Sequence, residues 1–196
     1  MPSPDTAPAD LLAALSSALA GLRADWYVFG AQAVTIWGRP RLTADVDVTV
    51  RLDPEDPTRL VSALERAGFH LRVSGADDFV RRTRVLPFVY VPNGLPLDLV
   101  LAGPGLEELF LSRAVRVDVA GISVPVIGPE DLVTTKILAG RPKDLEDIQG
   151  ILRERLPDVD LALIRGTLAQ LEGALGRSDL LPVFERTLAR AGPRRA

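Results

Sequence analysis

The stretch TADVDVTV, residues 43–50, constrains this chain more than any other, because it sets Asp45 and Asp47 two residues apart in a run of valines. Aspartate is depleted in strands, and a buried, unpaired carboxylate is costly. Alternate side chains of a strand point to the same face, so the two carboxylates would stand side by side, with Cα atoms about 6–7 Å apart, and the valines would face the core. A bound divalent cation would relieve their mutual repulsion.

A third carboxylate, Asp98, lies in the apolar stretch LPLDLVLA. If that strand neighbours the first, the three acids converge and could hold one or two divalent ions, which in phosphoryl chemistry activate an attacking oxygen and stabilise a leaving one. The alternative is that the acids cap helices, occupy turns or form salt bridges. Arginine partners for this alternative are available at Arg41, Arg51 and Arg82.

The composition narrows the chemistry further. The 196 residues include no cysteine and one histidine, His70, which excludes disulfides, thiol catalysis and cysteine-ligated zinc and disfavours a histidine-rich metal site. Carboxylate ligands favour Mg²⁺ or Mn²⁺. A net charge of −3 offers no global attraction for nucleic acid. The first ten residues lack the features of a signal peptide, and no long apolar run is present, so we expect a cytoplasmic protein with no membrane partner.

The order of elements predicts an α/β (α+β) fold, a mixed sheet with flanking helices followed by a C-terminal helical bundle. The break is expected near 127–129, which gives an αβ domain over 1–127 and a helical region over 128–196 packed on it. Strands are expected over 26–29, 45–52 and most of 69–101, including FVRRTRV, with a hairpin around 120–121. Arg81, Arg82 and Arg84 would then lie on a solvated edge strand.

A glycine turn precedes the paired acids. Gly30 ends a short apolar strand, a helix is expected over Ala31–Trp37, and the strand with the two aspartates returns. Backbone N–H groups at a helix start bind anions such as phosphate. The turn therefore predicts a place for phosphate beside the acids.

A second group of charged residues lies downstream. Lys136 falls in an otherwise apolar helix, where it either pairs with a carboxylate or reaches phosphates. Arg141 and Lys143 stand at the start of the next expected helix, where the dipole disfavours cations. Either an anionic ligand or pairing with the nearby Asp144 and Asp147 would explain why these cations stand at a helix start.

These segments resemble a known family. The stretch GAQAVTIWGRPRLTADVDVTV resembles the signature of the DNA polymerase β-like nucleotidyltransferase superfamily, and most closely that of AbiEii-type and related minimal nucleotidyltransferases. DLVTTKILAGRPKDLEDIQGIL resembles the family's lysine helix and the segment that follows it. The resemblance spans roughly 24–152. Its first motif is carried by Gly30, Ala33, Val34, Gly38, Arg41, Thr43, Asp45 and Asp47.

The resemblance implies a nucleotidyltransferase-like sheet in which Asp45, Asp47 and Asp98 bind Mg²⁺ or Mn²⁺ and carry catalysis. Asp45 and Asp47 would anchor the metal bound to an NTP, and Asp98 would help activate an acceptor hydroxyl as metal ligand or general base. The family has Gly or Ser where this chain has Ala31, so contacts there are expected from the backbone. The residues implied to bind the nucleotide are Gly30, Ala31, Arg41, Thr43, Lys136, Arg141, Lys143 and Asp147.

Two classes of function follow from the resemblance. In the first, the chain moves an NMP from an NTP to tRNA, as in AbiEii-like toxins, to a protein hydroxyl, or to a small molecule, as in aminoglycoside nucleotidyltransferases. A toxin would have a cognate antitoxin as partner. In the second, the same fold is a non-catalytic module that binds a nucleotide or a partner protein.

Overall fold

The computed structural model describes residues 7–39, 43, 45–52, 57–74 and 76–192. The chain divides into two compact units, one made of Met1–Gln32 with Leu42–Ile127 and the other of Ala33–Arg41 with Gly128–Ala196. The segment 33–41, which lies inside the predicted 1–127 domain, thus groups with the helical residues. The two units are not separated by a single cut in the sequence, because helix α2 (Gly30–Trp37) begins in one and ends in the other.

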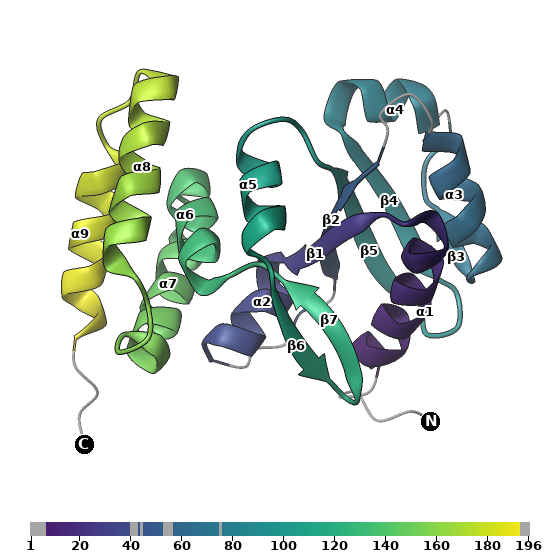
Figure 1. The fold of residues 1–196 in the computed structure, drawn as a ribbon, viewed down its shortest axis with the longest axis horizontal. Coiled ribbons are helices and arrows are strands. Elements are labelled where there is room, and N and C mark those ends of the chain that lie inside the picture. The colour runs from purple at the N-terminus through teal and green to yellow at the C-terminus, as the bar shows by residue number, and fades with distance from the viewer. Residues whose placement is uncertain (1–6, 40–42, 44, 53–56, 75, 193–196) are drawn as a thin grey trace. The chain divides into compact units, whose positions relative to one another are not determined.

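The first unit is built on one sheet, which in the described residues has seven strands in the order β3-β4-β5-β2-β1-β7-β6 (Figure 1). The pairs β2–β5 and β1–β7 are parallel and the other neighbours are antiparallel, so the predicted mixed sheet is confirmed. The strands are β1 (Asp25–Phe29), β2 (Val46–Arg51), β3 (Phe69–Leu71), β4 (Val85–Tyr90), β5 (Leu95–Leu101), β6 (Val115–Val119) and β7 (Ile122–Val126).

Strand β2 shows the predicted alternation on its apolar side. Val46, Val48 and Val50 are fully buried, whereas Asp47 is only half-buried. Asp45 precedes the first strand residue, so the prediction of a strand that includes both aspartates is wrong by one position. The pleat therefore fixes the direction of Asp47 but not that of Asp45.

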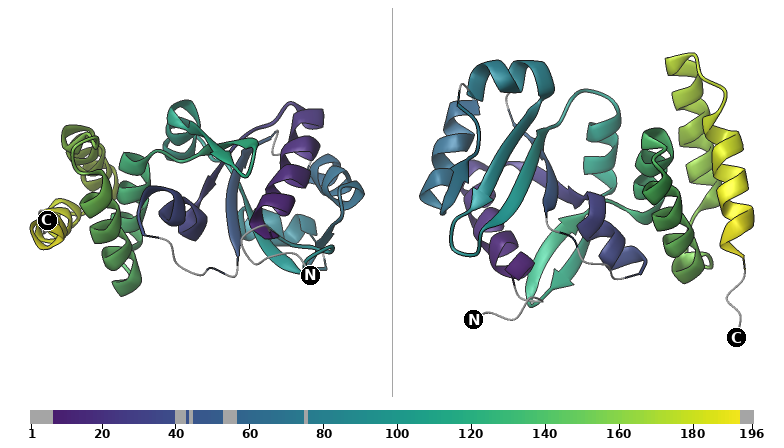
Figure 2. Two further views of the ribbon diagram at one scale, coloured as in Figure 1. Left: turned by 90° about the horizontal axis from the view of Figure 1, so that it is seen from below. Right: turned by 180° about the vertical axis from the view of Figure 1, so that it is seen from behind.

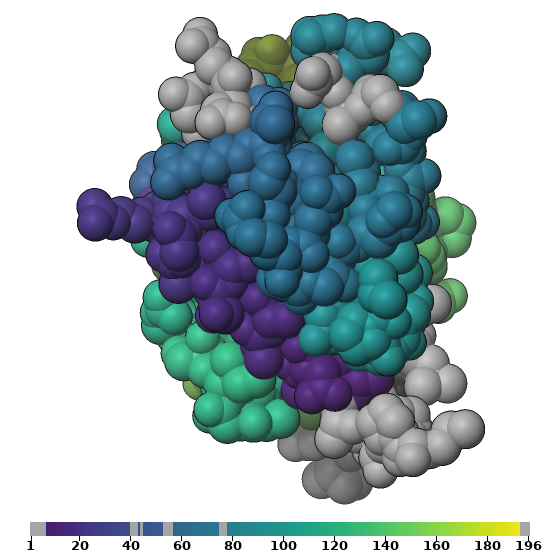
Figure 3. Space-filling view, turned by 90° about the vertical axis from the view of Figure 1, so that its right-hand side faces the viewer, coloured from purple at the N-terminus to yellow at the C-terminus, as the bar shows by residue number. Residues whose placement is uncertain are grey.

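Helices cover the apolar face of this sheet. Helix α1 (Ala7–Leu22) buries Leu11, Leu15 and Leu19 and packs on β5 and β7. Helix α3 (Pro57–Arg66) packs on α1 and β3, and in Figure 3 the blue surface of α3 lies beside the purple surface of α1. Helix α5 (Leu106–Arg113) contacts β1. The contacts of α1 with β5 and β7 bury the leucines of this helix against the sheet.

One predicted strand is a helix. Residues Ala76–Thr83 form α4, so Arg81 and Arg82 lie on a helix rather than on an edge strand. A pair between Arg81 and Asp78, three residues apart, and a hydrogen bond from the Thr83 hydroxyl to the Phe79 carbonyl both need helical spacing. The apolar residues of this segment do not alternate, which is the reason that the strand prediction failed.

The second unit contains four further helices, α6 (Pro129–Ala139), α7 (Pro142–Arg155), α8 (Leu161–Leu175) and α9 (Leu180–Ala191) (Figure 2). Helix α7 packs on α6 and α9, and α8 also contacts both of these. Gly140 ends α6 in a left-handed conformation with φ of 64°, which suits glycine. Over the described residues, no helix has the length and apolar character needed to cross a bilayer.

Candidate active site

Asp47 and Asp98 lie directly opposite each other on neighbouring parallel strands, because the β2–β5 register pairs their Cα atoms. The sequence predicted their proximity only if these strands were neighbours, and the sheet order confirms that they are. Opposed residues of a sheet point to the same face, here the one opposite the buried valines. The two carboxylates therefore share one surface of the sheet.

Gly30 lies against Asp47. It follows Phe29, which pairs with Asp47 across β1 and β2, and it has a positive φ of 65°. A Cβ at this position would lie 2.0 Å from Oδ2 and 2.8 Å from Cγ of Asp47. A side chain at residue 30 is thus excluded by the acid as well as by the backbone. The start of α2, with its positive dipole end, adjoins the carboxylate.

Asp45 is held by its neighbour Thr43. The threonine hydroxyl donates to Oδ1 of Asp45 at 2.8 Å. Thr43, which the resemblance implies to be a nucleotide contact, here orients an acid of the same motif. Ala31, the second turn residue, is buried in the first turn of α2. Arg41 lies outside the described residues.

Asp98 has a partner that the sequence did not reveal. Arg72 Nη2 lies 2.6 Å from Oδ1 of Asp98, and Arg72 Nε donates to the Phe88 carbonyl at 3.0 Å. The two residues are 26 positions apart and meet because the Arg72 side chain, at the end of β3, reaches across β4 to β5. No local sequence signal distinguishes Arg72 from other strand-end arginines.

The donor chemistry suits magnesium. Mg²⁺ is commonly bound by one or two carboxylates together with substrate phosphates, and Asp47 and Asp98 supply two on one face. A preformed three-acid cage is not seen: in the part of the chain that the structure describes, no three His, Asp or Glu side chains are grouped closely enough to hold a metal ion.

The downstream charges form a buried cluster in the helical unit. Lys136 Nζ lies 2.8 Å from Oδ2 of Asp147 and 3.2 Å from Oδ1 of Asp144. Lys136 is 6% exposed, Asp144 is fully buried and Asp147 is 9% exposed. Buried charges are retained only when paired in this way. Pairing with a carboxylate was one of the explanations that the sequence left open for Lys136, and the structure identifies the partners as Asp144 and Asp147, which the sequence had offered to Arg141 and Lys143.

Arg141, which stands directly before α7, binds the same cluster. Its guanidinium donates from Nε to Oδ2 of Asp144 at 2.6 Å and from Nη2 to Oδ1 at 3.1 Å. Burial alone would raise the pKa of Asp144, but hydrogen bonds from Arg141 and Lys136, together with their positive charges, outweigh it and lower that pKa. Lys143 is exposed on the first turn of α7.

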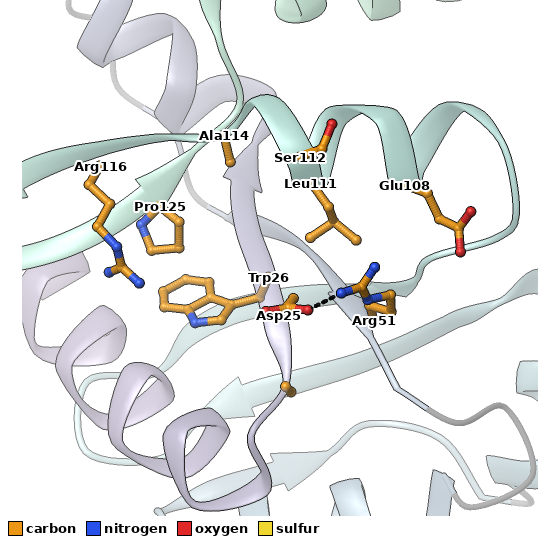
Figure 4. Close-up of a pocket in the computed structure, with 10 residues that line it drawn as sticks. Asp25, Trp26, Arg51, Glu108, Leu111, Ser112, Ala114, Arg116 and Pro125 are labelled. Carbon is orange, nitrogen blue, oxygen red and sulfur yellow. Dashed lines mark hydrogen bonds and ion pairs between the residues drawn. The ribbon is translucent and has the colours of Figure 1, made fainter.

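A separate pocket of about 370 Å³ opens at the other end of β1 and β2 (Figure 4). Trp26 lies at its centre, and the ion pair between Asp25 and Arg51 closes one side. Because Asp25 pairs with Arg51 and Phe29 pairs with Asp47, the pocket is four strand residues, or about 13 Å, from the acids. It is not part of the candidate site.

A mixed sheet with a glycine turn and neighbouring strand carboxylates defines a nucleotidyltransferase-like protein. The chain belongs to the family described as nucleotidyltransferase of unknown function (DUF6036), whose model matches residues 11–166. The predicted resemblance is thereby confirmed at the level of nucleotidyltransferases, and the family supports NMP transfer as the general activity.

Two solved structures share the fold. An antigenic nucleotidyltransferase-like protein from Paracoccidioides brasiliensis is 21% identical with a TM-score of 0.55, over 89% of this chain and 90% of its own. The antibiotic-resistance factor ANT(2'')-Ia is 13% identical with a TM-score of 0.59, over 88% of this chain and 96% of its own. A comparison with curated proteins finds no match.

Proposed function

We propose that this protein catalyses Mg²⁺-dependent transfer of an NMP from an NTP to an acceptor hydroxyl. The observation that carries the proposal is the register of β2 and β5, which sets Asp47 beside Asp98 on the face of the sheet opposite the buried valines. The close approach of Gly30 to Asp47 supports it, because that turn brings the start of a helix to the same acid.

The protein's groups would take distinct parts in the transfer. Backbone N–H groups at Gly30 and Ala31 would face the triphosphate, and Asp45 and Asp47 would hold the nucleotide's metal. The acceptor oxygen forms a bond to the α-phosphorus, the bond to the bridging oxygen breaks, and pyrophosphate leaves with that electron pair. Asp98 would receive the hydroxyl proton or hold the ion that acidifies it. Bound Mg²⁺ would supply charge stabilisation for the attacking and leaving oxygens.

The second unit has a different part in this proposal. The ammonium of Lys136 is already shared by Asp144 and Asp147, so we assign these three residues to holding α6 against α7. Arg141 donates two hydrogen bonds to Asp144 and belongs to the same cluster, whereas Lys143 is an exposed cation on the first turn of α7 that would attract phosphate.

A small-molecule hydroxyl is the acceptor we favour. The net charge of −3 provides no general attraction for a large polyanion such as tRNA, whose binding depends on neutralised phosphates. ANT(2'')-Ia, which shares the fold, is named as an antibiotic-resistance factor. The AbiEii-like toxin role, with tRNA as acceptor and an antitoxin as partner, rests on the sequence resemblance alone and predicts growth arrest on expression.

The test is transfer of label from each α-³²P-labelled NTP with Mg²⁺ or Mn²⁺. Acceptors would be aminoglycosides and other hydroxylated antibiotics, total tRNA, and the protein itself. Transfer by the wild type that is lost in Asp47→Asn and kept in Glu65→Gln, an exposed acid on α3, supports the proposal. Transfer that survives Asp47→Asn would refute it.

A non-catalytic module is the second candidate. It is favoured by the ion pair that engages Asp98 and by the absence of a three-acid group among the described residues. This alternative predicts metal-dependent NTP binding with no label transfer to any acceptor.

A further inference from the structure

Arg72 is held by three hydrogen bonds, two to the neighbouring strand β4 and one to β5. Its backbone N–H donates to the Pro87 carbonyl at 2.8 Å, and its Nε donates to the Phe88 carbonyl at 3.0 Å. The third contact is from Nη2 to Oδ1 of Asp98 at 2.6 Å. The backbone and side chain of Arg72 thus both bind β4, and the end of the side chain reaches β5.

These contacts place the guanidinium on the row of residues that carries the acids. Pro87 pairs with Asp98 across β4 and β5, and Asp98 pairs with Asp47 across β5 and β2. Arg72, which directly follows β3, is therefore two strands from Asp98 on β5 and three from Asp47 on β2. Arg72 lies just past the end of β3, and its backbone hydrogen bond to Pro87 holds it beside β4.

The pair contributes little by way of stability. The Arg72 and Asp98 side chains are 42% and 39% exposed, and ion pairs with this exposure are weak. An arginine held at three points for so small a gain in stability suggests a geometric role. The group whose geometry it sets is the carboxylate of Asp98.

We propose that Arg72 is a positioning residue for the metal–nucleotide site, an inference that rests on the proposed function. By holding Oδ1 of Asp98, it fixes the plane of the carboxylate and leaves Oδ2 for a divalent cation. Carboxylates that bind metals are commonly oriented by such a hydrogen bond from a neighbouring group. Thr43 makes the same kind of contact to Oδ1 of Asp45.

The chemistry requires an arginine. Its planar fork spans the Phe88 carbonyl through Nε and Asp98 through Nη2, and each bond fixes the direction of the other. A lysine would keep the positive charge but has a single ammonium at the end of a flexible stem, so it could not make both contacts with the same geometry. Arg72→Lys therefore separates positioning from charge.

The opposite role, in which Arg72 competes with the metal for Asp98, makes a contrary prediction. A competitor's removal would tighten metal binding, whereas removal of a positioning residue weakens it. The sign of the change in Mn²⁺ affinity thus decides between the two roles.

The experiment measures Mn²⁺ affinity by electron paramagnetic resonance in the presence of a non-hydrolysable NTP, on the full chain. We expect Arg72→Ala and Arg72→Lys each to weaken Mn²⁺ binding about tenfold or more, the usual effect of losing a group that orients a metal ligand. Arg51→Lys, which alters an exposed arginine–aspartate pair at the far end of β2, should leave it unchanged. Circular dichroism checks that each variant is folded. If Arg72→Ala does not fold, the Mn²⁺ affinity of Arg72→Lys alone tests the proposal.

Equal or tighter Mn²⁺ binding by Arg72→Lys would overturn the proposal. Asp47→Asn is measured in parallel to separate the two claims. If Asp47→Asn also leaves Mn²⁺ affinity unchanged, the proposed metal site itself is wrong. If Asp47→Asn abolishes binding and the Arg72 variants do not weaken it, only the role of Arg72 is wrong.

Discussion

The contact between Gly30 and Asp47 allows a substitution whose effect on the site can be separated from its effect on the backbone. Gly30 has φ of 65°, and Gly30→Ala adds a methyl group 2.0 Å from Oδ2 of Asp47. Gly94, in the turn between β4 and β5, has φ of 72° and no atom within 4 Å of an added Cβ. Gly94→Ala therefore carries the same backbone strain with no clash.

The two substitutions should therefore have similar effects on stability but different effects on activity. A non-glycine residue in the left-handed region costs about 1–2 kcal/mol, so both variants should melt about 2–8 °C lower. Contacts of a Cβ below 3.0 Å are not seen in proteins, so in Gly30→Ala the Asp47 oxygen has to move by at least 1.0 Å, the difference between 3.0 and 2.0 Å. A displacement of about 1 Å in a catalytic group costs on the order of 100-fold in rate.

The assay compares kcat/KM for label transfer, and Mn²⁺ affinity with bound nucleotide, in the two variants. Gly30→Ala should lose about 100-fold in kcat/KM and bind Mn²⁺ more weakly, while Gly94→Ala keeps both values within a few-fold of the wild type. Equal activity of the two variants, at equal loss of melting temperature, would refute the reasoning that Gly30 serves the position of Asp47.

Other contacts give further predictions. Lys136→Met should destabilise the fold by about 3–5 kcal/mol in thermal or urea denaturation, because it removes the buried ammonium that Asp144 and Asp147 share, and adding Asp147→Asn should restore part of this loss; unchanged stability with weakened NTP binding would instead favour a phosphate contact. The pKa of Asp144 is lower in the folded state than its ordinary value of 3.8, so its contribution to stability is complete above about pH 4 and is lost as the pH falls through the native pKa. The stability advantage of the wild type over Asp144→Asn in urea titrations should therefore shrink below pH 4, and a constant advantage would contradict this. Thr43→Val should weaken Mn²⁺ binding about 2–10-fold through loss of the hydrogen bond to Asp45, and unchanged affinity would show that the bond is only local.

Local patterns in the sequence were sufficient for the parts of the site that depend on one strand or one turn. The valine alternation predicted β2 and the direction of Asp47, and the glycine between a strand and a helix predicted the turn at Gly30. Both depend on contacts between near neighbours in the chain, which propensity and periodicity describe. The sequence predicted that Asp47 and Asp98 lie together only on the condition that their strands are neighbours, which a single sequence does not determine.

The features that the sequence did not reveal depend on distant contacts. Arg72 meets Asp98 through the order of three strands, and a single sequence holds no sign of that order. Residues 79–83 of the helix Ala76–Thr83 were predicted as part of a strand, although their apolar residues do not alternate and Val80 is the buried residue of a short amphipathic pattern. Arg84, an exposed residue next to this helix, donates hydrogen bonds to the carbonyls of Leu101 and Ala102.

For Lys136, the sequence left two explanations open, a carboxylate partner or a phosphate contact, and the structure favours the first. The sequence identified each charged residue but not which of them were partners. The distances from its ammonium to Asp144 and Asp147 provide a structural reason for all three residues. A role in holding α6 to α7 is compatible with a nucleotidyltransferase, because it leaves Lys143 as an exposed cation.

The central claim is that Asp47 and Asp98 act on one metal-bound nucleotide. A double-mutant cycle on Mn²⁺ affinity, measured with a non-hydrolysable NTP for the wild type, Asp47→Asn, Asp98→Asn and the double variant, tests it most directly. If the two acids share the ion, each single variant weakens binding strongly and the double variant loses little more than either. Losses that simply add, or single variants that bind Mn²⁺ as the wild type does, would contradict a shared site.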